Sequence, residues 1–270
     1  MVLKSVKSIK GKREYMEDRY AYIEKDDIIV SMVCDGHGGH EVADKTCKQL
    51  PELILQKLEE TRGTNVNHAL AIRRVVRDWG RGLDLEHSGS TLTGIAIKND
   101  IVYIYNIGDS RTCIKLKPGT FVYRLDPIFN NSGQFVERLN IDYERTSFYC
   151  TTDHDTDCSL EHSRVVNSGG YVSDSRLNGI LSVTRALGDG DIGAGISFIP
   201  DVTWVKKTEM TGPIVMYSDG IYEMQRYDAP ADFSDKYLYA IADNFGAKAL
   251  VDYAYTNGSD DNLTAMVVDY

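Results

Sequence analysis

Short segments rich in β-branched and aromatic residues recur along the chain, and over its middle part they follow one another with no helix between them. Such segments are typical of β-strands. Neighbouring strands joined by short turns favour antiparallel pairing, because parallel strands need a long crossover connection. The strands expected on this basis are residues 28–33, 90–97, 101–107, 112–117, 121–125, 214–217 and 263–268.

Two adjacent stretches after the first of these strands repeat apolar residues every three or four positions, as one face of an amphipathic helix does. They are residues 43–58, in which Pro51 is a potential kink, and residues 69–83. A weaker pattern over residues 238–255 predicts a third helix. The order of strands and helices predicts an α+β fold in which helices cover antiparallel sheets.

The clearest local pattern is TCIKLKPGTFVYRL, residues 112–125. Apolar residues alternate with other residues on both sides of Pro118-Gly119, which predicts a β-hairpin that turns at this dipeptide. Residues 126–150 have no clean period, and we expect them to leave the core as an insertion. The chain has no repeat, low-complexity tract or linker, so residues 1–270 are expected to form a single domain.

The chain has 30 basic and 40 acidic residues, a net charge of −10, and no basic run, so it does not favour a nucleic-acid partner. No stretch approaches the roughly 18 apolar residues needed to cross a bilayer. Five scattered cysteines without a CxxC pair favour a reducing compartment, and the first residues lack the apolar core of a secretory signal. We therefore expect a cytoplasmic location, with a nuclear location also open. We also expect the protein to be a monomer.

Acidic residues stand at the ends of several apolar strands: Asp35, Asp109 and Asp219 follow a strand, and Asp261 precedes one. A single acid in such a place is usually a turn former or a helix cap. Several carboxylates at one edge of a sheet repel one another, and a divalent cation removes that penalty. The sequence therefore predicts a metal site at this edge.

Oxygen ligands are those preferred by magnesium, manganese or calcium, whereas zinc prefers histidine and cysteine. Aspartates shared by two ions about 3.5–4 Å apart form the arrangement that activates water for attack on phosphoryl groups. A nearby histidine can protonate the leaving oxygen, and an arginine can bind the phosphate with its forked donors. The residue types therefore indicate phosphoryl transfer to water.

Nine short motifs occur in the order found in the metal-dependent protein phosphatases, the type 2C serine/threonine phosphatases, which this chain resembles over residues 11–268. The motifs are REYMED (13–18), DGHGG (35–39), GST (89–91), GDSR (108–111), TTDH (151–154), RLNGILSVTRALGD (176–189), PDV (200–202), SDG (218–220) and DN (261–262). The resemblance implies a four-layer αββα fold, in which two stacked antiparallel sheets (a β-sandwich) are flanked by helices. It also implies Mn²⁺- or Mg²⁺-dependent hydrolysis of phosphoserine and phosphothreonine in proteins by a metal-bridging water, without a phosphoenzyme.

The resemblance also implies which residues bind the metals. Asp35 resembles the aspartate that bridges two ions, and Gly36 resembles the residue that offers its main-chain carbonyl to one of them. Asp219 and Asp261 are similar to the remaining direct ligands of the other ion. Asp109, together with Asp219, resembles the site of a weaker third metal.

Four further positions match residues around the metals. Glu17 and Asp18 resemble partners of metal-bound water, Arg13 resembles the arginine that binds phosphate, and His37 resembles the general acid for the leaving oxygen. Glu223 stands where the family often has aspartate, which puts the third metal in question.

Two other functions stay open. A phosphatase-like binding module would keep the fold and lose catalysis, but the matching ligands are all present. A metal-dependent phosphodiesterase would use similar chemistry, but the net charge of −10 counts against a nucleic-acid substrate. The Cys158-x5-Arg164 spacing is that of cysteine-based phosphatases, yet it reads better as the start of a helix that ends before Gly169-Gly170.

Overall fold

The fold is built around a ten-stranded sheet in which every pair of neighbouring strands is antiparallel. The computed structural model describes residues 2–83, 87–222 and 234–270. The strand order is β1-β17-β16-β8-β15-β7-β6-β3-β2, and β11 also pairs with β8. The strands are β1 (Val2–Ile9), β2 (Arg19–Lys25), β3 (Ile28–Cys34), β6 (Leu92–Lys98), β7 (Ile101–Ile107), β8 (Arg111–Leu125), β11 (Ile141–Cys150), β15 (Asp201–Lys206), β16 (Met210–Tyr217) and β17 (Leu263–Asp269).

The side chains of β3 show how this sheet divides into two layers. β3 is buried along its whole length, so both of its faces are covered. Ile28 and Val30 pack into a core with two helices, whereas Ile29 and Val33, which point the other way, pack against residues of β16 and β17. The two helices on the outer face are α1 (Glu41–Glu60) and α2 (Asn65–Arg81).

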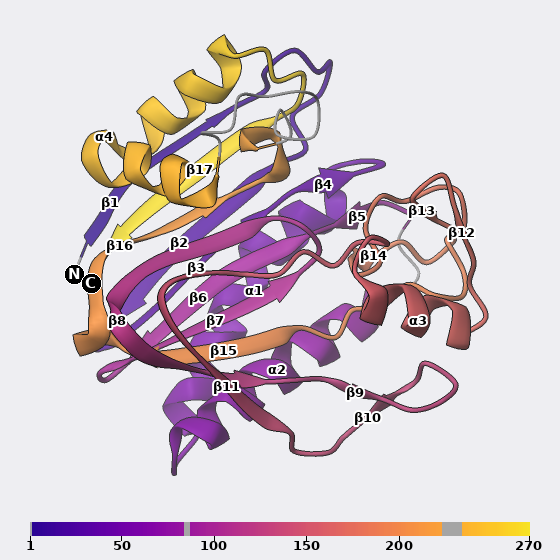
Figure 1. Ribbon diagram of the computed structural model, residues 1–270, viewed down its shortest axis with the longest axis horizontal. Helices are drawn as coiled ribbons and strands as arrows, with labels where there is room; N and C mark the ends of the chain where they lie inside the picture. The colour runs from indigo at the N-terminus through magenta and orange to yellow at the C-terminus, as the bar shows by residue number, and fades with distance from the viewer. Residues whose placement is uncertain (1, 84–86, 223–233) are drawn as a thin grey trace.

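A third core lies on the far side of the second sheet. There Leu238 and Leu250 of α4 (Asp235–Thr256) pack against Val215 of β16 and Val267 of β17. The layers are therefore α1 and α2, a first sheet that contains β3, a second sheet that contains β16 and β17, and α4 (Figure 1). This confirms the four-layer αββα sandwich. β1 and β17 lie side by side in it, with Val2 opposite Asp269 (Figure 1).

The three predicted helices are present. Pro51 lies inside α1, and Thr64 and Asn67 form a capping box at the start of α2. The weak pattern near the C-terminus has a structural cause. The two halves of α4 meet at Gly246, whose φ of 80° interrupts the helix and shifts the apolar face. No helix within the described ranges is long and apolar enough to cross a membrane.

The predicted hairpin over residues 112–125 is wrong. These residues form one strand, β8, whose first half pairs with β16 and whose second half pairs with β15. Gly119, with a φ of 76°, lies in the bend between the halves. The alternation of apolar with other residues is that of an extended strand. The two halves, however, belong to different layers and do not pair with each other, so β8 joins the two sheets.

Four strands of the ten-stranded sheet were not predicted. β1 and β2 are at the two edges of the sheet, where polar side chains are common, and β11 is largely exposed. β15 is buried and short. Within residues 126–150, which sequence alone left without a period, the structure has a small hairpin followed by β11; the hairpin strands are β9 (Ile128–Phe129) and β10 (Phe135–Val136).

A buried group of charged side chains supports the end of the sandwich near α3 (Ser159–Asn167). Glu161 Oε2 accepts hydrogen bonds from Arg164 Nε and Nη2 at 3.0 and 2.9 Å, and its Oε1 accepts from Arg185 Nη2 at 2.6 Å. Arg185 also pairs with Asp201 at 2.9 Å. Arg164 is thus a structural partner within a helix that ends before Gly169, which agrees with the rejection of a cysteine-phosphatase loop.

Candidate active site

The acidic residues singled out from the sequence lie at one end of the sandwich. Asp35 follows β3, Asp219 follows β16, and Asp261 stands two residues before β17. Burial and the charges of Asp18 and Asp219 raise the pKa of Asp35 well above its usual value. Burial and the charge of Asp219 likewise raise the pKa of Asp261. The structure therefore brings the carboxylates of Asp18, Asp35, Asp219 and Asp261 close to one another.

Two of the carboxylates have a buried oxygen that receives no hydrogen bond from any residue that the structure describes. Ser218 Oγ donates a hydrogen bond of 2.8 Å to Asp18 Oδ2, but within the described residues Asp18 Oδ1 has no partner, and neither has Asp219 Oδ1. Burial raises the pKa of Asp18 to about 7. Buried carboxylate oxygens need a compensating partner, and oxygen-rich acidic clusters suit hard divalent cations. The donor set therefore fits Mn²⁺ or Mg²⁺.

Asp261 is held from two sides. Its Oδ1 accepts a hydrogen bond of 2.7 Å from the backbone N–H of Asn262, and its Oδ2 lies 2.6 Å from Arg13 Nη2. Asn262 in turn ties the segment that carries Arg13 to β17. Its Nδ2 donates to the carbonyls of Lys10 and Tyr15 at 2.8 and 2.9 Å. In the sequence Asn262 is recognisable only as part of the DN motif. Its hydrogen bonds with Lys10 and Tyr15 are seen only in the folded chain.

Glu17 and Gly36 make one close contact around the turn that follows β3. The backbone N–H of Gly39 donates to Glu17 Oε1 at 2.7 Å. A Cβ at Gly36 would lie 2.7 Å from the carbonyl oxygen of Glu17, so no larger residue fits at position 36 without a shift of the backbone. Glu17 therefore supports the glycine turn next to Asp35.

His37 is positioned by a carboxylate that the sequence did not assign to the site. Its Nε2 lies 2.8 Å from Oδ2 of Asp189, whose side chain is buried. His37 lies in a small sheet formed by β4 (Gly36–His37), β5 (Gly89–Ser90) and β14 (Leu187–Gly188), and Asp189 directly follows β14. A Cβ at Gly89 would lie 2.1 Å from both interacting atoms. Asp189 is the last residue of the RLNGILSVTRALGD motif, and this motif was the sequence feature that could have pointed to it.

Asp109 lies beside the cluster and is also buried. The Tyr222 hydroxyl donates to its backbone carbonyl at 2.7 Å. The pKa of Tyr222 is raised by burial and by nearby charges that include Asp109 and Asp219, so both acids lie close to this ring. Glu223, which bears on the third metal, lies outside the described residues.

This site is a cluster of carboxylates at one end of an αββα sandwich, with an arginine and a carboxylate-bound histidine beside it. A sandwich of this kind, with such a site, defines a class of phosphatases. The family model described as Protein phosphatase 2C matches residues 4–263, and the chain belongs to this family.

Two relatives agree with this assignment, and a solved structure has a similar fold. Probable protein phosphatase 2C 27 of Oryza sativa is 28% identical, over 96% of this chain and 73% of the relative. Protein phosphatase 2C homolog 1 of Saccharomyces cerevisiae is 28% identical, over 95% of this chain and 88% of the relative. The fold is similar to that of serine-threonine phosphatase 2C from Toxoplasma gondii, with a TM-score of 0.71, 19% identity, and coverage of 98% of this chain and 93% of that one.

The resemblance implies that His37 is the general acid for a seryl or threonyl leaving oxygen. On this hypothesis, replacing His37 by alanine is expected to slow hydrolysis of phosphoserine peptides by about 10²–10⁴-fold, the usual contribution of a general acid. Aryl phosphates should lose far less, because their leaving group needs no proton. The measurement is kcat for both substrate types, with His87→Ala as control, since the His87 side chain is 88% exposed. Equal losses on both substrates would contradict the general-acid role.

Proposed function

We propose that this protein is a Mn²⁺- or Mg²⁺-dependent protein serine/threonine phosphatase. The observation that carries the proposal is the gathering of Asp18, Asp35, Asp219 and Asp261 at one end of the sandwich. Buried oxygens of Asp18 and Asp219 have no donor in the part of the chain that the structure describes. A cluster of this kind costs stability unless cations neutralise it. A binding module without catalysis would have no need to keep it.

The residues that would hold two ions are Asp35, the carbonyl of Gly36, Asp219 and Asp261. Glu17 and Asp18 would orient their water ligands, and Asp109 with Asp219 would hold a weaker third ion. When bound, the ions would supply a water nucleophile at neutral pH and neutralise charge on the phosphoryl group.

The remaining chemistry is carried by side chains of this chain. Arg13, whose side chain is 54% exposed, would bind the phosphate oxygens with its forked guanidinium. His37, with 29% of its side chain exposed, would donate a proton to the leaving seryl or threonyl oxygen. Asp189 would hold the imidazole in place through the 2.8 Å contact. No protein nucleophile is required, so no phosphoenzyme forms.

The substrates proposed are phosphorylated proteins, and the proposed location is the cytoplasm or nucleus. The net charge of −10 supports neither a nucleic-acid partner nor an anionic membrane surface. No partner subunit is needed to complete the site, because the proposed ligands and side chains all come from one chain, and we propose that the protein acts as a monomer.

Metal removal tests the proposal. The purified chain should hydrolyse phosphoserine and phosphothreonine peptides with added Mn²⁺, lose this activity with a chelator, and regain it with excess Mn²⁺. The measurement is phosphate release, with a phosphotyrosine peptide as a specificity control. Activity that survives complete metal removal would contradict the metal-dependent mechanism.

A further inference from the structure

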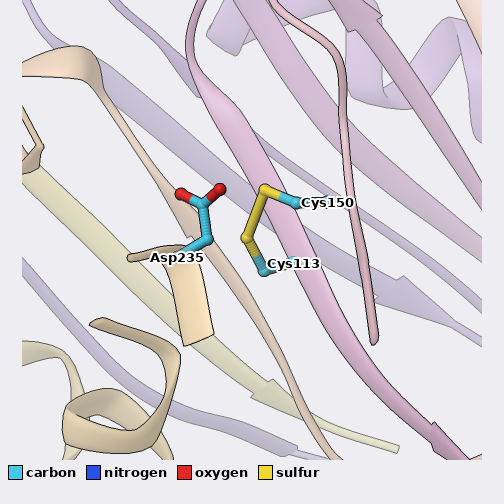
Figure 2. Close-up of side chains that lie close together, drawn as sticks. All are labelled: Cys113, Cys150 and Asp235. Carbon is cyan, nitrogen blue, oxygen red and sulfur yellow. A yellow bond between two sulfur atoms is a disulfide. The ribbon is translucent and has the colours of Figure 1, made fainter. Parts of the chain in front are cut away.

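Cys113 and Cys150 form a disulfide between β8 and β11, at directly opposed positions of the two strands (Figure 2). The bridge spans 37 positions, so it closes a loop that contains the bend of β8, the β9–β10 hairpin and β11. The scattered cysteines favour a reducing compartment, where disulfides are usually transient or redox-sensing. The remaining cysteines, Cys34, Cys47 and Cys158, are free thiols.

The disulfide contacts a group of polar side chains at the start of α4. Cys113 Sγ lies 3.2 Å from the Tyr217 hydroxyl, which donates to Asp235 Oδ1 at 2.9 Å. The same carboxylate oxygen accepts a hydrogen bond of 2.8 Å from Arg111 Nη1. Figure 2 shows the carboxylate of Asp235 directly beside the disulfide.

This group continues to the candidate active site. Arg111 binds both carboxylate oxygens of Asp153, at 2.9 and 2.8 Å, and its guanidinium stacks 3.5 Å from the centre of the Tyr222 ring. Tyr222 donates to the carbonyl of Asp109. On β16, Tyr217 stands only two residues before Asp219. A continuous path of contacts therefore joins the disulfide to two acids of the site.

The oxidation state of Cys113 decides how Tyr217 is hydrogen-bonded. In the disulfide, the sulfur has no hydrogen, so the single phenolic hydrogen of Tyr217 goes to Asp235. In the dithiol, the Cys113 S–H can donate to the Tyr217 oxygen, while Tyr217 still donates to Asp235. Reduction thus changes the contacts at the start of the path.

We propose that Cys113–Cys150 is a reversible redox modification site, and that its state sets the metal affinity of the candidate active site. The inference rests on the proposed function for its consequence, but the modification itself does not. The disulfide fastens the base of the loop formed by residues 113–150 to the end of β8 that leads to the site. Reduction releases this fastening and loosens the arrangement of Arg111, Tyr222 and Asp109.

The exchange is chemically simple. Cys150 is a half-buried residue, whereas Cys113 is fully buried, so the thiolate of a small dithiol attacks Cys150 Sγ and the S–S bond breaks. Cys113 leaves as a thiolate and takes up a proton. The second thiol of the reductant then attacks the mixed disulfide, releasing Cys150 as a thiol and the reductant as its own disulfide. Peroxide reverses the reaction: two protein thiols and one peroxide give the disulfide and two waters.

A metal site is the competing use of these residues, because both sulfurs and an Asp235 oxygen lie within 4.8 Å of one another. The charge pattern disfavours it. Asp235 is already paired with the Arg111 guanidinium, which would repel a dication at this oxygen. A structural zinc site also takes four ligands, whereas this group offers three.

The test compares oxidised and dithiothreitol-reduced wild type with Cys113→Ser/Cys150→Ser. Cys158→Ser is the matched control, since it removes a cysteine outside the bridge. Mass spectrometry after alkylation should show Cys113 and Cys150 protected until reduction. For the metal-free protein, reduction should lower Tm by at least about 5 °C, because the unfolded chain regains loop entropy. Calorimetry should show Mn²⁺ binding weakened by about fivefold or more, a typical coupling between sites.

The double variant should bind Mn²⁺ as the reduced protein does and should not respond to dithiothreitol, whereas Cys158→Ser should respond like wild type. Three results would overturn the proposal. One is free alkylation of both cysteines after peroxide treatment. Another is a Mn²⁺ affinity that differs by less than about twofold between the two states. The third is stoichiometric Zn²⁺ binding by the reduced pair. Alkylation and Tm are read without catalysis, so they distinguish failure of this inference from failure of the proposed phosphatase activity.

Discussion

Asp219→Asn is expected to abolish phosphatase turnover and to weaken Mn²⁺ binding by at least about a hundredfold, because even the loss of an outer partner of a metal ligand costs up to that much. Asparagine keeps the size of the side chain and removes its charge. Asp219 Oδ1 is buried and has no donor among the residues described, and the charge of Asp219 contributes to the raised pKa of Asp35. The measurements are Mn²⁺ calorimetry and phosphopeptide kinetics.

The same variant should be more stable than wild type in the absence of metal, because one of the mutually repelling carboxylates is gone. Thermal unfolding with a chelator present measures this difference. Asp252→Asn is a matched control on α4, since that side chain is 50% exposed. A fully active Asp219→Asn protein would remove Asp219 from the site, and unchanged metal-free stability would contradict the repulsion argument.

Glu161→Ala is expected to destabilise the fold by about 3–5 kcal/mol, the usual result of breaking a buried ion pair. Glu161 receives hydrogen bonds from both Arg164 and Arg185, and these side chains are almost completely buried. Removing the carboxylate leaves two buried guanidinium groups without their shared partner. Urea unfolding measures the change. Glu137→Ala is the control, because the Glu137–Arg74 pair is exposed and should contribute less than about 1 kcal/mol.

The pH dependence of stability gives a second measurement of Glu161. Burial alone would raise the pKa of Glu161, but the charges of Arg185 and Arg164 outweigh it and lower the pKa below the ordinary value of 4.5. A lowered pKa stabilises the folded state above about pH 4.5, and this contribution is lost as the pH falls further. Between about pH 5 and pH 3, wild type should therefore lose more stability than Glu161→Gln. Parallel curves for the two proteins would contradict this.

Much of the fold could be read from the sequence, because periodicity and residue type are local. The apolar runs of β3, β6 and β7 predicted buried strands, and the repeat over residues 43–58 predicted α1. The edge strands β1 and β2 were not predicted, because their side chains are more polar. The pattern of residues 112–125 was also correct as a pattern, but pairing is not local, and the halves of β8 pair with β15 and β16.

Some residues of the candidate site could likewise be predicted from the sequence, and others could not. The carboxylates at strand ends were identifiable because an acid after an apolar run is visible in the sequence, and strands of one sheet bring their ends together. The partner of His37 was not identifiable from the sequence, because Asp189 lies 152 positions further along the chain. Asn262 and the buried Glu161 likewise acquire their roles only through contacts made in the folded chain.

The sequence by itself determined the class of fold, the αββα layers implied by its motifs, and the acids that the structure gathers. Tertiary structure alone decided how β8 crosses between the sheets, which carboxylate holds His37, how Glu161 joins two arginines, and that Cys113 faces Cys150. The physical reason is the range of the interactions. Backbone preference and burial act over a few neighbouring residues, whereas ion pairs, hydrogen bonds and disulfides join side chains that only the packed fold brings within a few ångströms.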